Sequence, residues 1–145
     1  MAGGKATTFD NDLLKLILNA TPIANIADNA ATSPLTNLYF ALHTADPGVG
    51  GAQNTSETTY SGYARVAVAR TTAGFTVSGN SCVLVNPVNF GTPADSAGVS
   101  LTWFSIGIAL SGAGKILYRG PLSPTITIVV GTPPQMTTGT TITES

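Results

Sequence analysis

The stretch that decides the fold is LYFALHTADPG, residues 38–48, in which an apolar strand runs directly into a sharp turn. Pro47 fixes its own φ and disfavours a helical conformation at the residue before it, and Gly48 permits the positive φ that many turns require. A second stretch, GYARVAVAR at residues 62–70, opens from a glycine into alternating side chains. The two stretches predict strands joined by a long polar loop, residues 46–60, of a length that is usually functional or mobile.

Further short strands follow along the chain, each bounded by Gly, Pro or Asn. Gly79-Asn80, for example, is a two-residue hairpin signal between apolar segments. Strands are expected over residues 37–43, 62–70, 74–78, 81–90, 100–110, 115–119, 125–130 and 136–143. Seven or eight short antiparallel strands of this kind predict a mainly β, sandwich or jelly-roll-like single domain.

One α-helix is expected near the start of the chain, over residues 9–20. Apolar residues recur there at helical spacing and form one stripe: Phe9, Leu13, Leu16, Ile17 and Ala20. Pro22 prevents the helix from continuing far. The stripe packs either on the chain's own sheet or on a neighbouring subunit. Residues 1–8 are expected to form a flexible arm, and residues 9–145 the single domain.

The chain carries little charge for its 145 residues. Charged residues make up only 9%, against a typical share of roughly 25%, and the net charge is −1. Since surface charge keeps free monomers dispersed, this composition favours a protein that assembles, as a homo-oligomer. The six basic residues are scattered, which argues against nucleic acid. Neither a signal peptide nor an apolar run long enough to span a membrane is visible, so no membrane partner is expected.

The sequence shows no established catalytic or metal-binding motif. His43 is the only histidine and lies outside any G-x-S-x-G context, so we expect its ring to bond backbone where the strand ends. Cys82 is the only cysteine, and it is expected to be a buried, inert thiol. The acids are spread along the chain, although folding could bring Asp46, Glu57 or Asp95 together. We therefore expect no enzyme, no metal and no cofactor.

Adjacent aromatic residues on one strand point to a partner. Trp103 and Phe104 place one ring on each face of their strand, so one of them faces something other than the domain's own core. The candidate partner interface is therefore formed by Phe9, Leu13, Leu16, Ile17 and Trp103.

The two stretches that open this section resemble the "LY-ALHTADPG … GYAR-AV" signature of a family of small virion proteins of tailed phages, called tail-fibre-like or decoration proteins. Looser similarities follow in residues 103–108 and 114–122, so the resemblance spans about residues 37–131. Two segments depart from the family pattern, at residues 108–110 and 131–132. The resemblance implies a small β-domain in which the signature residues form structural turns: His43, Asp46, Pro47, Gly48, Gly62, Tyr63 and Arg65.

The resemblance also implies a function, that of a non-enzymatic structural protein made in the bacterial cytoplasm and built into the virion. A capsid decoration (cement) protein is expected first, which would bind the assembled lattice of the major capsid protein and stabilise it by many weak contacts. A tail-tip or tail-fibre-like component for host attachment, with tail proteins as partners, is the alternative. A small carbohydrate-binding module or a small hydrolase is a remote alternative.

Overall fold

The computed structural model describes residues 7–23 and 34–145. Over these residues the chain is mainly β, with nine strands in antiparallel sheets and one N-terminal helix, which confirms the predicted fold class. The chain forms two compact units. Of the described residues, the first comprises 7–23, 34–37, 69–87 and 137–145, and the second 38–68 and 88–136. Most of the arm predicted at residues 1–8 lies outside the described residues, and the single domain predicted over residues 9–145 stays a prediction.

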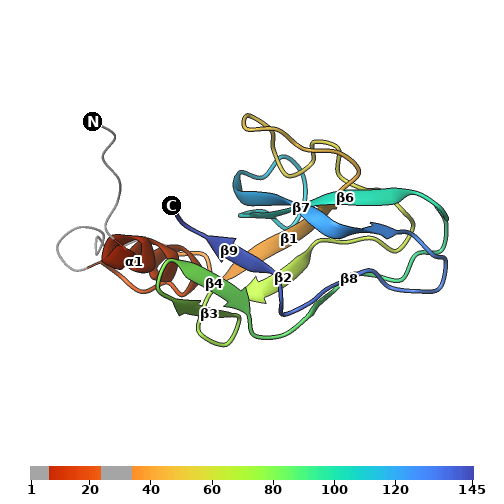
Figure 1. Cartoon of the computed structure of the whole chain (residues 1–145). Coiled ribbons are helices and arrows are strands. Elements are labelled where there is room, and N and C mark those ends of the chain that lie inside the picture. Colours follow the sequence, from red (N-terminus) through yellow and green to blue (C-terminus); the bar gives the residue numbers. More distant parts are fainter. Residues whose placement is uncertain (1–6, 24–33) are drawn as a thin grey trace. The chain divides into compact units, whose positions relative to one another are not determined.

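The first unit is a helix on a small sheet. Helix α1 (Thr7–Leu18) lies against strands β3 (Phe75–Ser78) and β4 (Ser81–Leu84), as Figure 1 shows. Strand β4 also pairs with β9 (Thr141–Thr143), giving the order β3-β4-β9. The predicted Gly79-Asn80 turn joins β3 to β4, and Gly79 has a positive φ of 58°. The unit's buried apolar residues are Leu14, Leu18, Phe75, Cys82, Leu84 and Ile142.

The helix differs from the prediction in its bounds and in its buried side. It ends at Leu18 rather than at residue 20, because Ala20 adopts a positive φ of 53°. Its fully buried residues are Leu14 and Leu18, four positions apart, which the predicted stripe omitted. The stripe faces elsewhere: Phe9 is 39% exposed. The helix therefore packs on its own sheet, but with a different face from the one predicted.

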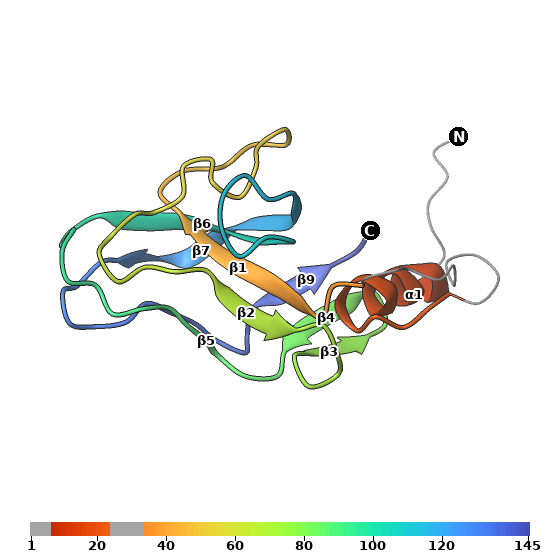
Figure 2. The same cartoon turned by 180° about the vertical axis from the view of Figure 1, so that it is seen from behind.

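The second unit contains a four-stranded sheet in the order β2-β1-β6-β7. Its strands are β1 (Asn37–His43), β2 (Val66–Ala69), β6 (Ser100–Gly107) and β7 (Ile116–Thr127). Figure 2 shows β1 between β2 and β6. On one face, Phe40 lies opposite Ile106 and Leu42 opposite Phe104, and all four side chains are buried. A two-stranded ladder of β5 (Val88–Asn89) and β8 (Gln135–Met136) belongs to the same unit.

Strand β1 has the predicted bounds, whereas other strands were predicted too long or divided differently. The predicted strand 81–90 divides into β4 and β5 around Pro87, whose ring cannot donate a ladder hydrogen bond. The predicted strand 136–143 divides into β8 and β9 at a turn in which the Thr140 amide donates to the Thr137 carbonyl. Strand β7 joins two predicted strands, with a register shift against β6. Strand β2 begins at Val66 instead of residue 62, because the preceding residues serve the site described next.

Candidate functional site

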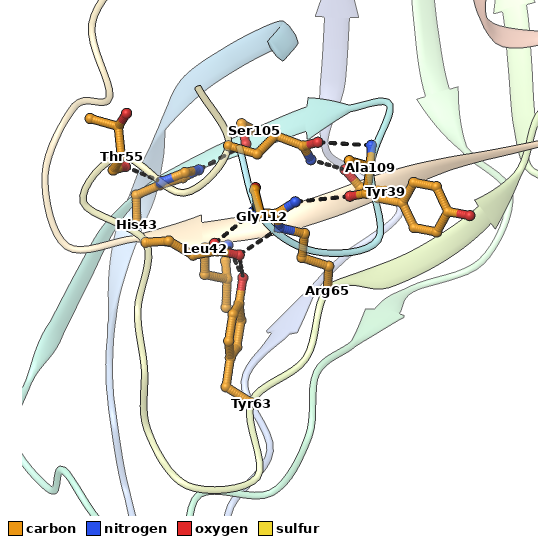
Figure 3. Close-up of polar contacts among 11 residues, drawn as sticks. Tyr39, Leu42, His43, Thr55, Tyr63, Arg65, Ser105, Ala109 and Gly112 are labelled. Atoms are coloured by element: carbon orange, nitrogen blue, oxygen red, sulfur yellow. Dashed lines mark hydrogen bonds and ion pairs between the residues drawn. The ribbon is translucent and has the colours of Figure 1, made fainter. Parts of the chain in front are cut away.

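A long loop, residues 44–65, joins β1 to β2 and is called the strap here. His43 and Ser105 lie on the face of the four-stranded sheet opposite to Phe40 and Leu42, because side chains alternate along a strand. The strap reaches this face at Thr55, whose carbonyl contacts His43. The strap is anchored by a clamp of polar side chains: His43, Gln53, Glu57, Tyr63, Arg65 and Ser105. Figure 3 labels His43, Tyr63, Arg65 and Ser105 among them.

His43 links three segments of the unit. Its Nδ1 lies 2.9 Å from the Thr55 carbonyl oxygen and its Nε2 lies 2.8 Å from Ser105 Oγ. A carbonyl only accepts, so Nδ1 carries a proton, and in the neutral ring Nε2 accepts from the Ser105 hydroxyl. Burial lowers the pKa of His43 below its ordinary 6.5, the bond to Thr55 and the Glu57 charge opposing this only in part. The ring is therefore neutral, and its two hydrogen bonds connect β1 to the strap and to β6.

This serine–histidine pair has the spacing of a nucleophile and its base, but not the access. Both residues are 0% exposed, so a substrate cannot reach the Ser105 hydroxyl in this structure. A carboxylate would be expected behind the ring in a catalytic triad, yet Nδ1 faces a backbone carbonyl. Asp46 instead accepts from the Gly48 amide and pairs with Arg119.

Arg65 and Glu57 form the charged part of the clamp. Arg65 Nε and Nη2 donate to the two carboxylate oxygens of Glu57, each at 2.7 Å. The side chain of Arg65 is only 2% exposed and that of Glu57 14%. Arg65 also donates to the carbonyls of Ala109 and Gly112 in the loop between β6 and β7. The ion pair is thus largely buried, four of the five guanidinium N–H groups donate to these partners, and the pair ties the strap to that loop.

Tyr63 joins the ion pair to the sheet. Its hydroxyl donates to Glu57 at 2.9 Å and accepts from the Leu42 amide of β1 at 3.1 Å. Burial, above all, raises the pKa of Tyr63, so the hydroxyl stays protonated and continues to donate. Residues 62–65 do not extend β2 because the side chains of Tyr63 and Arg65 are engaged in the clamp.

Gln53 is the least predictable member of the clamp. It is 0% exposed, and its side-chain amide donates to the Tyr39 carbonyl at 3.1 Å while accepting from the Ala109 amide at 3.0 Å. A side chain at Gly107 would overlap the Gln53 amide. The glycine is therefore required by close approach rather than by its φ.

The predicted turn residues all lie at the strap and its ends. At the first turn, the Asp46 carboxylate accepts from the Gly48 amide at 2.8 Å, and Gly48 has a φ of 78°. Gly62 has a φ of 97°, and a side chain there would overlap the Thr92 carbonyl. Sequence reasoning missed Gln53, Thr55 and Ser105 altogether, because single polar residues in a loop or strand give no periodic signal.

Comparison with known protein families identifies the family of the chain. A family model described as "Podophage GP4 fiber I protein gp80" matches residues 6–144. The chain belongs to this gp80 fibre family. No curated protein matches it. Membership in the gp80 fibre family makes the chain a structural protein of a phage virion, and the virion its location. This supports the phage resemblance at the level of a virion protein family.

The predicted partner interface of this gp80-family chain occupies two places, one in each unit. In the first, Phe9 is exposed and Leu13, Leu16 and Ile17 are half-buried on α1. In the second, Trp103 is half-exposed, with the Arg119 guanidinium 5.2 Å from its ring centroid. Phe104, on the opposite face, stacks on Phe40 inside the unit. The two rings therefore face opposite ways, and the use of Trp103 as an interface stays a prediction.

The described part of this gp80-family chain also has a surface hollow next to the clamp. An open hollow of about 520 Å³ lies beside the clamp, between the strap and residues 110–112. Residues 7–23 and 34–145 contain no group of three or more His, Cys, Asp or Glu placed to hold a metal ion. Across the same residues, no helix has the length and apolar character needed to cross a membrane.

Proposed function

We propose that this chain is a subunit of a virion fibre that works through protein–protein contacts and without catalysis. The observation that carries the proposal is the match over residues 6–144 to a family described as a fibre protein. The clamp supports a role without catalysis, because its hydrogen-bonding groups already bind one another and the backbone to hold the strap on the sheet. Its partners would then be further copies of itself and neighbouring proteins of the tail.

The low charge of the chain fits such contacts. With 9% charged residues, two copies meet with little like-charge repulsion, and half-exposed apolar side chains on α1 and at Trp103 offer contact area. Trp103 and Arg119 are of the residue types that dominate binding energy in interfaces. These two places are the contact surfaces we assign to the fibre role.

Electron microscopy of intact phage with gold-labelled antibodies raised against the purified chain tests this proposal. If the chain is a fibre subunit, gold should lie along the fibres and none over the head. Pre-immune serum is the control. Gold spread over the head would overturn the fibre role in favour of a decoration protein. Absence of the chain from purified particles would contradict both roles.

A Ser105→Ala phage tests the catalytic alternative separately. A structural role predicts particles that contain the variant chain and infect normally, because the buried hydroxyl serves only the clamp. Particles that contain normal amounts of the folded chain but fail at a hydrolytic step of infection would show that Ser105 is a nucleophile.

A further inference from the structure

Among the polar contacts that hold the strap on its sheet, one is made by a titratable ring, that of His43, whose Nδ1 lies 2.9 Å from the Thr55 carbonyl oxygen. His43 is the only histidine in the sequence and is fully buried. Next to it, the Thr58 backbone amide donates to the Leu42 carbonyl at 3.0 Å, and the backbones of His43 and Glu57 form an isolated antiparallel β-bridge. Further along the strap, the Gln53 amide donates to the Gly114 carbonyl at 2.8 Å. Residues 53–58 of the strap are all polar or charged, whereas Tyr60 and Tyr63 at its far end pack on each other and Tyr63 stacks on Phe90. Segments fixed mainly by polar contacts, such as residues 53–58, open at lower free energy than apolar cores do.

A second proton on the His43 ring is disfavoured in the closed state, because desolvation of the buried ring outweighs the Thr55 carbonyl and the nearby carboxylates that favour the charge. The charged groups that face the ring are Glu57 and Arg65 from the strap and Asp46 from the first turn. Both carboxylates are already paired, Glu57 with Arg65 and Asp46 with Arg119. From β6 the ring meets the Ser105 hydroxyl, whose proton loses its acceptor once Nε2 is protonated. A buried imidazolium here costs desolvation without gaining a free counter-charge.

We propose that His43 is a proton-operated latch: when its ring takes up a proton, the strap detaches from the sheet while the sheet stays folded. The open strap lets water reach the ring, which relieves the cost of the charge. The backbone hydrogen bonds that pair the four strands do not involve the His43 ring or the Ser105 hydroxyl, so the sheet keeps its pairing when the ring is protonated.

The pH dependence of strap opening follows from the difference in proton binding between the closed and the open state. The closed state holds His43 with a pKa below 6.5, so the open state binds more protons and gains population as the pH falls below about 6.5. One proton is taken up on opening, so the fraction of open strap rises about tenfold for each pH unit until the lowered pKa is reached. No other histidine contributes in this range, since the sequence has only one.

Hydrogen exchange of single amides between pH 7.5 and 4.5, followed by NMR and corrected for the intrinsic rate, tests the latch on the full chain. The reporters are the strap amides of Gln53 and Thr58. The control is the Ile128 amide, which donates to the Val99 carbonyl in the same unit at 2.8 Å. We expect protection of the strap amides to fall about tenfold per pH unit below 6.5, with Ile128 unchanged. A flat profile, or a parallel fall at Ile128, overturns the proposal.

A His43→Gln variant separates the histidine from the carboxylates. In this variant, the protection of the strap amides should not fall between pH 6.5 and 5.5. If protection falls as in the parent chain, another group causes the effect and the latch is overturned. If this variant does not fold, Ser105→Ala serves instead. Removing the hydroxyl that bonds the neutral ring raises the pKa of His43, so the total fall in protection should be smaller. A fall as large as that of the parent chain would overturn the proposal.

Discussion

Replacement of Arg65 by methionine is the most informative perturbation of the clamp. The change keeps an unbranched apolar stem and removes the guanidinium, so the Glu57 carboxylate, whose side chain is only 14% exposed beside Arg65, loses its positively charged partner. Removing one partner of a buried ion pair costs about 3–5 kcal/mol, because the remaining charge is uncompensated. Bonds to the carbonyls of Ala109 and Gly112 are lost with it. We expect a loss of about 4 kcal/mol in the free energy of unfolding.

Urea unfolding followed by tryptophan fluorescence measures this loss directly. Trp103 is the only tryptophan in the sequence and lies in the same unit as Arg65, so its emission reports that unit. A domain of about this size is stable by only about 5–15 kcal/mol, and a loss of about 4 kcal/mol lowers Tm by roughly 10 °C. Arg65→Lys keeps the charge without the two-pronged geometry and should lose an intermediate amount.

Arg119→Met is the matched control for Arg65→Met. It breaks an arginine–carboxylate pair in the same unit, but there the side chains of Arg119 and Asp46 are 24% and 40% exposed. An exposed pair is worth about 0–1 kcal/mol, so this variant should lose about 1 kcal/mol, including its contact with Trp103. Equal losses in the two methionine variants, or a loss below about 1 kcal/mol for Arg65→Met, would refute the view that the clamp is a buried structural element.

Three further changes test other parts of the account. Arg70→Met removes donors to the Leu16 and Ile17 carbonyls at the end of α1, each at 2.5 Å, and should lower the protection of the helix amides in hydrogen exchange by about tenfold or more. Gly107→Ala should destabilise the second unit by about 2 kcal/mol or more because it displaces Gln53, whereas Gly112→Ala, with open space and a φ of 72°, should cost about 1 kcal/mol in the same urea assay. Burial raises the pKa of the Cys82 thiol to about 11, so at pH 8 a disulfide reagent should react only at the rate at which the first unit opens, and prompt reaction in native buffer would contradict its burial.

The sequence predicted those parts of the fold that depend on local pattern. Strand β1 and the Gly79-Asn80 turn follow from alternation and from turn chemistry, and both were predicted correctly. The helix was recognised from its periodicity, but its buried face was not. Leucine or isoleucine occupies residues 13, 14, 16, 17 and 18, so more than one stripe fits, and only the packed sheet selects Leu14 and Leu18.

The site was predictable only in part, because its contacts join residues far apart in the chain. The signature stretches contributed His43, Tyr63 and Arg65, yet nothing in the sequence relates Arg65 to carbonyls more than 40 residues away. Ser105 meets His43 across 62 residues. One usable sign was overlooked: Gly107 interrupts an apolar strand, and such a glycine often marks the close approach of another segment, here Gln53.

A cryo-electron reconstruction of the intact particle tests the central claim most directly, since it shows where this chain lies and what it touches. The fibre account predicts density for its four-stranded sheet in the fibres, in a few to a few dozen copies, with Trp103 or the α1 flank at a contact. Density over the capsomers at icosahedral positions would contradict that account and establish a decoration role.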